Sequence, residues 1–198
     1  MPVICDMSSE LCSRPIDIKK YGVIYAGAQK NCGPAGTTVV IVRKDLINKD
    51  TILPITPAVI NYHMVNTASE QMYNTPATWS CYMTGVYLEY MNTKGIKFWE
   101  DLTIQRSKKL YDYIDSTQGY YINNVDPAFR SRMNIVFQMA KGKDIEKKFV
   151  ADAEKVGLID LKGHVDIGGL RASIYNAMPI EGIEALINFM KKFKDENP

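Results

Sequence analysis

Residues 25–36 are Tyr25-Ala26-Gly27-Ala28-Gln29-Lys30-Asn31-Cys32-Gly33-Pro34-Ala35-Gly36. They follow a short apolar run, residues 21–25, and lead into a Gly-Pro turn. Lys30 stands among small residues, which allow another molecule to approach the backbone closely. Desolvation favours the neutral form of an amine, and a neutral amine can attack a carbonyl carbon. The stretch therefore predicts a buried strand that ends near a Schiff-base lysine, with a solvated turn lysine as the alternative.

An acidic residue occupies an equivalent place earlier in the chain. Asp6 closes the apolar run of residues 2–5 and is followed by two serines. Short apolar runs are typical of buried strands, and open α/β sheets bind ligands at strand ends. In pyridoxal phosphate enzymes a lysine holds the cofactor aldehyde and a carboxylate pairs with the ring nitrogen. Asp6 and Lys30 fit these two roles, although an aspartate before serines is also a common turn former or helix N-cap.

The rest of the sequence predicts an α/β protein. Strands are expected at residues 3–5, 23–25, 37–43, 133–139 and 170–174, and helices at residues 77–91, 97–114, 145–156 and 180–193. Residues 45–67 are predicted to be mostly loop. Within the helix at 77–91, Tyr82, Val86 and Tyr90 recur every four residues, and this stripe is predicted to face the core.

The pattern changes near Ser116-Thr117-Gln118-Gly119, which predicts a domain boundary there. Residues 1–117 are then one domain, and residues 118–198 are a second, smaller α/β domain. The alternation of strands and helices after the boundary supports this division.

Composition excludes several classes of function. The 24 basic and 22 acidic residues are interspersed, so no basic patch indicates nucleic-acid binding. The longest aliphatic run is four residues, 39–42, too short to span a bilayer, and no leader sequence is recognised. We therefore expect a cytoplasmic protein.

Four cysteines and two histidines are the candidates for metal or disulfide chemistry. They are Cys5, Cys12, Cys32, Cys81, His63 and His164. Because the cysteines show no paired short spacing, the sequence favours reduced core thiols over a zinc site or a disulfide framework. No metal site is predicted, and Cys32 is expected to be structural.

Several motifs together carry a resemblance to a known family. They are Cys5-Asp6-Met7-Ser8-Ser9, Ser13-Arg14-Pro15-Ile16-Asp17, Tyr21 to Asn31, Gly33-Pro34-Ala35-Gly36, Tyr73-Asn74-Thr75-Pro76, Arg130 to Ile135, and Gly168 to Ala177. In this order they resemble the phosphoserine aminotransferases, class-V enzymes of fold-type I that use pyridoxal phosphate. The resemblance spans essentially the whole chain. It implies the carboxy-terminal half of a longer enzyme: the end of the large cofactor-binding domain, mostly parallel sheet with helices, plus a small α/β domain.

The resemblance also implies roles for further residues. Gln29 would hydrogen-bond the cofactor phosphate, while Asn74 and Thr75 would reach the partner subunit's cofactor phosphate, which requires a homodimer with shared active sites. Arg171 would bind the substrate α-carboxylate, and His164 would help to hold the substrate phosphate. One departure stands next to His164, because the family usually has arginine at the position of Val165.

The reaction implied by the resemblance is a transamination. It would pass the amino group of L-glutamate to 3-phosphohydroxypyruvate and yield O-phospho-L-serine and 2-oxoglutarate. The loss of a cation at Val165 makes the phosphate-bearing substrate less certain than the pyridoxal chemistry. Two alternatives remain open: a non-catalytic fragment, or another enzyme of the same fold such as an alanine–glyoxylate aminotransferase or a cysteine desulfurase.

Overall fold

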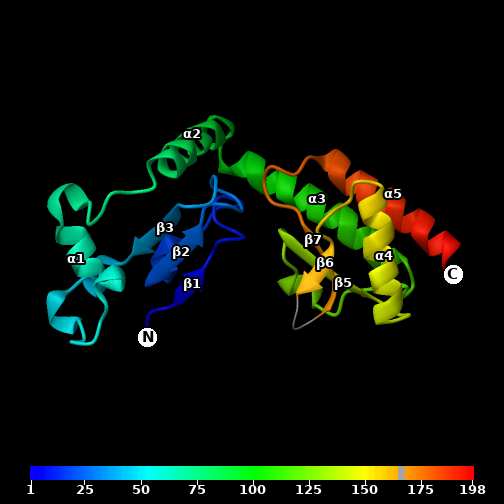
Figure 1. The fold of residues 1–198 in the computed structure, drawn as a ribbon, viewed down its shortest axis with the longest axis horizontal. Coiled ribbons are helices and arrows are strands. Elements are labelled where there is room, and N and C mark those ends of the chain that lie inside the picture. The colour runs from blue at the N-terminus through cyan, green and yellow to red at the C-terminus, as the bar shows by residue number, and fades with distance from the viewer. Residues whose placement is uncertain (165–167) are drawn as a thin grey trace. The chain divides into compact units, whose positions relative to one another are not determined.

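The computed structural model describes residues 1–164 and 168–198, and at positions 51 and 71 it describes the backbone alone. It divides into two compact units, Met1–Lys97 and Phe98–Pro198 (Figure 1). The division falls earlier than the sequence boundary at 117/118, because the helix before that boundary supplies Leu110 and Ile114 to the core of the second unit. The assignment of residues 1–117 to the cofactor-binding domain and 118–198 to the small domain stays a prediction.

A three-stranded sheet forms the centre of the first unit. Its strands are β1 (Ile4–Asp6), β2 (Val23–Gly27) and β3 (Thr38–Val42), in the order β1-β2-β3. β1 and β2 are parallel, with Asp6 opposite Tyr25, and β2 and β3 are antiparallel. The three strands predicted for this region are confirmed in position. The predicted burial is confirmed for β2 but wrong for β1, where Ile4 is 66% exposed. Parallel pairing brings the carboxyl ends of β1 and β2 to the same edge of the sheet.

Beyond the sheet, the first unit consists of short helices and one long helix. They are η1 (Ile18–Lys20), η2 (Lys44–Leu46), η3 (Lys49–Thr51), η4 (Ala58–Ile60), α1 (Tyr62–Thr67), η5 (Ser69–Gln71) and α2 (Thr78–Lys94). The segment predicted as loop, residues 45–67, thus includes single helical turns and the short α1.

The predicted core face of α2 is wrong. Tyr82, Val86 and Tyr90 are all exposed, and the exposed fraction of Tyr82 is 64%. The helix instead buries Thr84 and Met91. The reason is a close approach of backbone: a Cβ at Gly33 would lie 2.9 Å from the Cα of Thr84. The helix therefore directs Thr84, rather than its aromatic stripe, towards the Gly-Pro turn.

The second unit combines a four-stranded antiparallel sheet with three helices. Its elements are α3 (Ile96–Ser116), β4 (Tyr121–Ile122), η6 (Pro127–Phe129), β5 (Asn134–Met139), α4 (Lys143–Lys155), β6 (Lys162–His164), β7 (Gly168–Ser173) and α5 (Ile180–Glu196). The strand order is β4-β5-β7-β6. The strands predicted at 133–139 and 170–174 and the four predicted helices are confirmed, whereas β4 and β6 were not predicted.

The core of the second unit lies on one face of its sheet. In β5 the residues Ile135, Phe137 and Met139 are buried, while Val136 between them is exposed. This alternation is typical of a sheet covered on one side only. The predicted inward residues of α5 are all buried: Ile183, Leu186, Ile187 and Met190. No helix in the described part of the chain is both long enough and apolar enough to span a bilayer.

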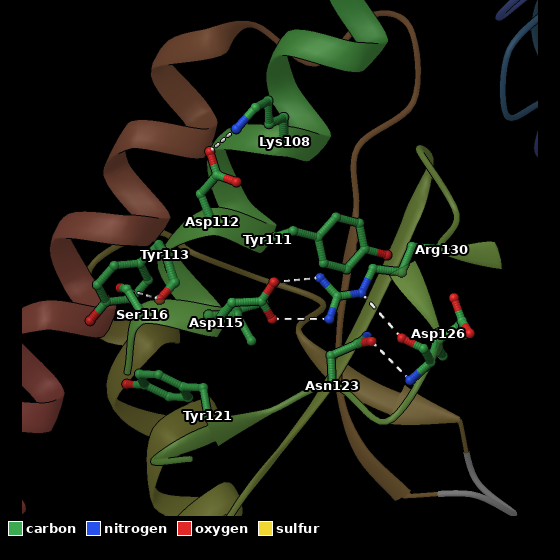
Figure 2. A network of polar contacts seen from close by, with 12 residues as sticks. Lys108, Tyr111, Asp112, Tyr113, Asp115, Ser116, Tyr121, Asn123, Asp126 and Arg130 are labelled. Carbon is green, nitrogen blue, oxygen red and sulfur yellow. Dashed lines mark hydrogen bonds and ion pairs between the residues drawn. The ribbon is translucent and has the colours of Figure 1, made fainter. Parts of the chain in front are cut away.

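One arginine ties the segment before β5 to α3 (Figure 2). Arg130 donates to both carboxylate oxygens of Asp115, at 2.6 and 3.0 Å, and its Nε donates to the carbonyl of Val125 at 3.2 Å. Its guanidinium lies 4.8 Å from the centre of the Tyr111 ring. The Tyr111 hydroxyl in turn donates to the Ser131 carbonyl at 3.0 Å. These contacts fix the backbone that enters β5.

Candidate active site

The predicted pairing of Asp6 with Lys30 follows directly from the sheet. Asp6 is the last residue of β1, and Lys30 lies in the turn that follows β2, at the same edge of the sheet. That turn is closed by amide groups of Cys32 and Gly33, which both donate to the Ala28 carbonyl at 2.9 Å. The sheet thus brings an exposed carboxylate and a half-buried amine to one edge.

Two serines connect the acid to the lysine. The Ser8 amide donates to Asp6 Oδ1 at 2.8 Å, and the Ser8 hydroxyl accepts from the Gly27 amide at 3.0 Å. Lys30 Nζ donates to the Ser9 hydroxyl at 3.0 Å. The Ser9 carbonyl accepts from Asn31 Nδ2 at 2.7 Å. The turn after β1 and the turn after β2 are therefore joined by side-chain and backbone hydrogen bonds.

Asp6 is held in its ionised form. The pKa of its carboxyl group is lowered chiefly by the hydrogen bond from the Ser8 amide, then by the Ser8 hydroxyl and by the positive charge of Lys30. Hydrogen bonding to the charged form and a nearby opposite charge both favour a carboxylate. The turn-forming alternative for Asp6 is also realised, since its bond to Ser8 is an Asx turn. A carboxylate at this edge suits the protonated nitrogen of a pyridine ring.

Gln29 lies beside Lys30 and is exposed. Its side-chain amide folds back over Gly27, where a Cβ would lie 2.6 Å from Gln29 Oε1. Glycine at position 27 is therefore what leaves room for this amide at the sheet edge. The arrangement keeps a neutral hydrogen-bonding group next to the lysine.

Asn74 and Thr75 lie just before α2 and are both exposed. Asn74 Nδ2 donates to the Thr75 carbonyl at 3.1 Å, so the pair forms a local turn. The structure therefore leaves these two polar side chains at the surface of the first unit.

Arg171 belongs to the second unit and lies in the middle of β7. It pairs with Val136 of β5, on the face of the sheet that the helices leave open. Its Nε is buried and has no hydrogen-bond acceptor among the residues that the structure describes. A buried guanidinium nitrogen without an acceptor is costly unless a ligand supplies one. This unsatisfied donor fits a carboxylate, which accepts two parallel bonds from a guanidinium.

His164 ends β6 and points to the other side of the sheet. Its neighbour on the same strand face, Lys162, pairs with Leu170, which is buried in the core. His164 lines a cleft of about 410 Å³ between the β6–β7 hairpin and α4. Arg171 lies outside this cleft, because adjacent residues of β7 face opposite ways. His164 and Arg171 therefore serve different surfaces, and Val165 and Asp166 lie outside the described residues.

The structure thus brings some predicted residues together and separates others. Asp6, Gln29 and Lys30 share one edge of the first sheet, whereas His164 and Arg171 occupy opposite faces of the second. The sequence did not predict the roles of Ser8 and Ser9. Their signal was their position, two and three residues after Asp6, the residue at which β1 ends. The expectation of core thiols holds for Cys32 alone, since Cys81 is exposed and Cys5 and Cys12 are partly exposed.

Comparison with known proteins places the chain in a family. Residues 1–186 match the Aminotransferase class-V family. A curated phosphoserine aminotransferase of Janthinobacterium sp. (strain Marseille) is 48% identical over 195 residues, which cover 98% of this chain and 52% of that protein. The chain therefore spans about half the length of the curated relatives it matches.

Solved structures agree with the sequence comparison. The phosphoserine aminotransferase of Bacillus circulans subsp. alkalophilus has a TM-score of 0.91 at 42% identity, covering 100% of this chain and 54% of that one. The pyridoxal-phosphate-bound phosphoserine aminotransferase of Trichomonas vaginalis has a TM-score of 0.88 at 40% identity, covering 96% and 53%. The resemblance and the fold class inferred from the motifs are confirmed. The chain belongs to the class-V aminotransferase family.

Proposed function

We propose that this chain carries the Schiff-base lysine of a pyridoxal-phosphate-dependent phosphoserine aminotransferase. The observation that carries the proposal is the edge where Asp6 and Lys30 are joined through Ser8 and Ser9. A half-buried amine beside an ionised carboxylate is what a pyridoxal cofactor requires of its enzyme. The family match and the similarity to phosphoserine aminotransferases support the substrate class.

Each residue at the sheet edge would have a separate task. The cofactor supplies an electron sink once its ring nitrogen is protonated. Asp6 would hold the proton on that nitrogen, and the Ser8 amide keeps Asp6 ionised for this purpose. Lys30 Nζ would bind the cofactor aldehyde and, when released, carry the proton at the substrate α-carbon. Ser9 orients Lys30 Nζ through its hydroxyl, and Gln29 would donate to the cofactor phosphate.

Two residues of the second unit would bind substrates. Arg171 would bind the α-carboxylate of glutamate or phosphoserine by donating hydrogen bonds to it, which would satisfy its buried Nε. His164 would bind a substrate phosphate from the opposite face of the sheet. Because the two side chains face apart, we propose that they serve the active sites of two different subunits.

A homodimer follows from this proposal. Asn74 and Thr75 are exposed and would donate to the cofactor phosphate of the partner subunit, as phosphates accept from neutral donors as well as cations. Shared sites of this kind require a twofold arrangement of two copies. We place the enzyme in the cytoplasm, because four cysteines without a structural disulfide are typical of that compartment.

Cofactor binding tests the proposal directly. The chain is mixed with pyridoxal phosphate, reduced with borohydride and digested, and the labelled peptide is identified by mass spectrometry. We expect the label on Lys30, together with visible absorption that Lys30→Ala abolishes. Lys44→Ala, at an exposed lysine of the same unit, should keep both signals. Labelling spread evenly over exposed lysines would contradict the proposal.

Half-reactions of the natural polypeptide identify the substrate. Phosphoserine, alanine and cysteine are each mixed with the cofactor-loaded enzyme, and the loss of its visible absorption is timed. We expect phosphoserine to react fastest of the three amino acids. Equal rates for the three amino acids would overturn the substrate assignment while leaving the aminotransferase proposal in place.

A further inference from the structure

Two cysteine thiols face each other beside the candidate active site. Cys12 lies at the end of the turn that follows β1, and Cys32 lies two residues after Lys30 in the turn that follows β2. Their Sγ atoms are 3.8 Å apart, and the Cys32 thiol is directed to that of Cys12.

The backbone holds both thiols in place. The turn after β1 is closed by amides of Glu10 and Leu11, which donate to the Met7 carbonyl at 2.9 and 2.8 Å. Cys12 adopts a left-handed conformation, with φ at 65°. Non-glycine residues seldom adopt this conformation unless the surrounding structure fixes it. Here it directs Cys12 towards the turn that carries Cys32, to which the Ser9 carbonyl is already bonded through Asn31.

The two thiols differ in chemistry. Cys12 is partly exposed, whereas only 1% of Cys32 is accessible to solvent. The hydrogen bond from Cys32 lowers the pKa of the Cys12 thiol. The same hydrogen bond, together with burial, raises the pKa of Cys32. Since the thiolate is the reactive form of cysteine, Cys12 is the nucleophile of the pair and Cys32 is the resolving thiol.

We propose that Cys12 and Cys32 form a redox-modification site that hydroperoxides oxidise to an intramolecular disulfide. The Cys12 thiolate attacks the terminal oxygen of the peroxide, breaks the O–O bond and releases an alcohol or water, which leaves a sulfenic acid on Cys12. Cys32 then attacks Cys12 Sγ, the S–S bond forms and the hydroxyl leaves as water. Two thiols lose two electrons, and the peroxide gains them. A small approach is enough, because a disulfide joins sulfurs about 2.0 Å apart.

The disulfide would join the two turns that hold the candidate site. Cys12 follows the segment with Asp6, Ser8 and Ser9, and Cys32 belongs to the turn with Lys30. The bond would therefore link these two turns covalently, in addition to the hydrogen bonds between Ser9 and residues 30 and 31. This inference goes beyond the proposed function and does not rest on it.

Peroxide oxidation of the full 198-residue chain tests the site. A variant with Cys5→Ser and Cys81→Ser keeps only the two thiols in question and is treated with stoichiometric hydrogen peroxide. Remaining thiols are then blocked with N-ethylmaleimide, and the intact mass is measured. We expect the loss of two hydrogens, no added maleimide, and a peptide that joins residues 12 and 32. Dithiothreitol should restore two alkylatable thiols.

Single variants in the same background separate the two thiols. Cys32→Ser should leave a sulfenic acid on Cys12, which dimedone traps. Cys12→Ser should react with peroxide at least about tenfold more slowly, because the buried thiol is the less ionised one. A dimedone adduct that forms faster on Cys32 than on Cys12 would overturn the assignment of the nucleophile.

A denatured reference guards against misfolded variants. The native chain with all four cysteines is oxidised with and without concentrated guanidinium chloride, and the disulfide-linked peptides are compared. The native chain should give the 12–32 bond at least about tenfold faster than the denatured chain, in which the thiols are no longer held together. Equal rates, a mixture of pairings in the native chain, or thiols that all remain alkylatable would overturn the proposal.

Discussion

At the scale of single residues, burial decides what Tyr111 can do. Its side chain is 8% exposed, packs in the core of the second unit, and donates to the Ser131 carbonyl. Burial raises the pKa of Tyr111 to about 12, an effect that the nearby charge of Arg130 only partly opposes. Folding therefore favours the neutral phenol over the phenolate. Asp6 shows the opposite effect, because hydrogen bonds from Ser8 stabilise its carboxylate form in the folded state.

This difference predicts an alkaline loss of stability. A tyrosine in the unfolded chain ionises near pH 10, so between pH about 10 and about 12 the native state binds more protons than the unfolded state. Stability should therefore fall as the pH rises through this window, with Tyr111 contributing about 2–3 kcal/mol at its upper end. Urea unfolding followed by circular dichroism from pH about 8 to about 12 measures it.

Tyr111→Phe isolates the contribution of this residue. The variant should be less stable near neutral pH by about 1 kcal/mol, since it loses the bond to Ser131. Its stability should then fall less steeply above pH about 10. Tyr82→Phe, at a 64% exposed tyrosine, is the control and should leave the curve in place. An unchanged slope in Tyr111→Phe would contradict the role of burial.

At the scale of elements, the Lys30 turn depends on its fit against α2. Gly33 closes the turn with its amide, and a Cβ at this position would lie 2.5 Å from Thr84 Oγ1 and 2.9 Å from Thr84 Cα. The second contact is with backbone, which a side-chain rotation cannot relieve. The turn and the helix are therefore packed backbone to backbone, and the position of Lys30 depends on this contact.

Gly33→Ala should accordingly destabilise the first unit. We expect a cost of about 1–3 kcal/mol, as for other overpacked sites. Gly85→Ala is the matched control. Gly85 lies in α2, the helix that contacts Gly33, and has open space around its Cβ position. It should raise stability by about 0.5–1 kcal/mol through better helix propensity. Thermal unfolding of both variants decides, and equal effects would refute the close contact.

Elements with a strong apolar period could be predicted from the sequence, and α5 is the clearest case. Its buried residues repeat with helical spacing, and all of them except Phe193 were predicted to face inward. The stripe on α2 has the same spacing, but the packing surface of α2 is set by Gly33, and a pattern does not reveal its partner. Likewise Asp6 and Lys30 could be predicted because each comes at or just after the end of a short apolar run that forms a strand. Ser9 could not, since a serine after an aspartate is equally at home in any turn.

At the scale of the whole molecule, apolar burial is uneven. The second unit has a continuous core drawn from α3, α4, α5 and its sheet. The buried cluster of the first unit is confined to a few residues near β1, β2 and the turns that follow them. Most of the large apolar side chains that are exposed belong to the first unit, among them Trp79 at 70% and Ile55 at 85%. Stability should therefore reside mainly in the second unit.

Residues 96–198, which keep α3 whole, should fold without the rest of the chain. We expect a cooperative thermal transition, because their core is complete within the segment. Phe149→Ala should cost about 3–5 kcal/mol, since Phe149 is fully buried and contacts rings of the sheet and of α5. Circular dichroism of the isolated segment provides the measurement. A broad, non-cooperative melt of the unsubstituted segment would show that its core needs residues 1–95.

The length of the segment from Asp6 to Ser9 is fixed by the contacts of its residues. Asp6 is fixed by strand pairing, Ser8 bonds to Asp6 and Gly27, and Ser9 bonds to Lys30 and Asn31. Insertion or deletion of one residue here would shift the segment and move these groups away from their hydrogen-bond partners. Each of these four hydrogen bonds uses at least one side-chain atom, so both the length of the segment and its polar side chains are needed. Among natural variants of this chain, the number of residues between the strand and Ser9 should therefore be constant, and the polar side chains of Asp6, Ser8 and Ser9 should be kept with it.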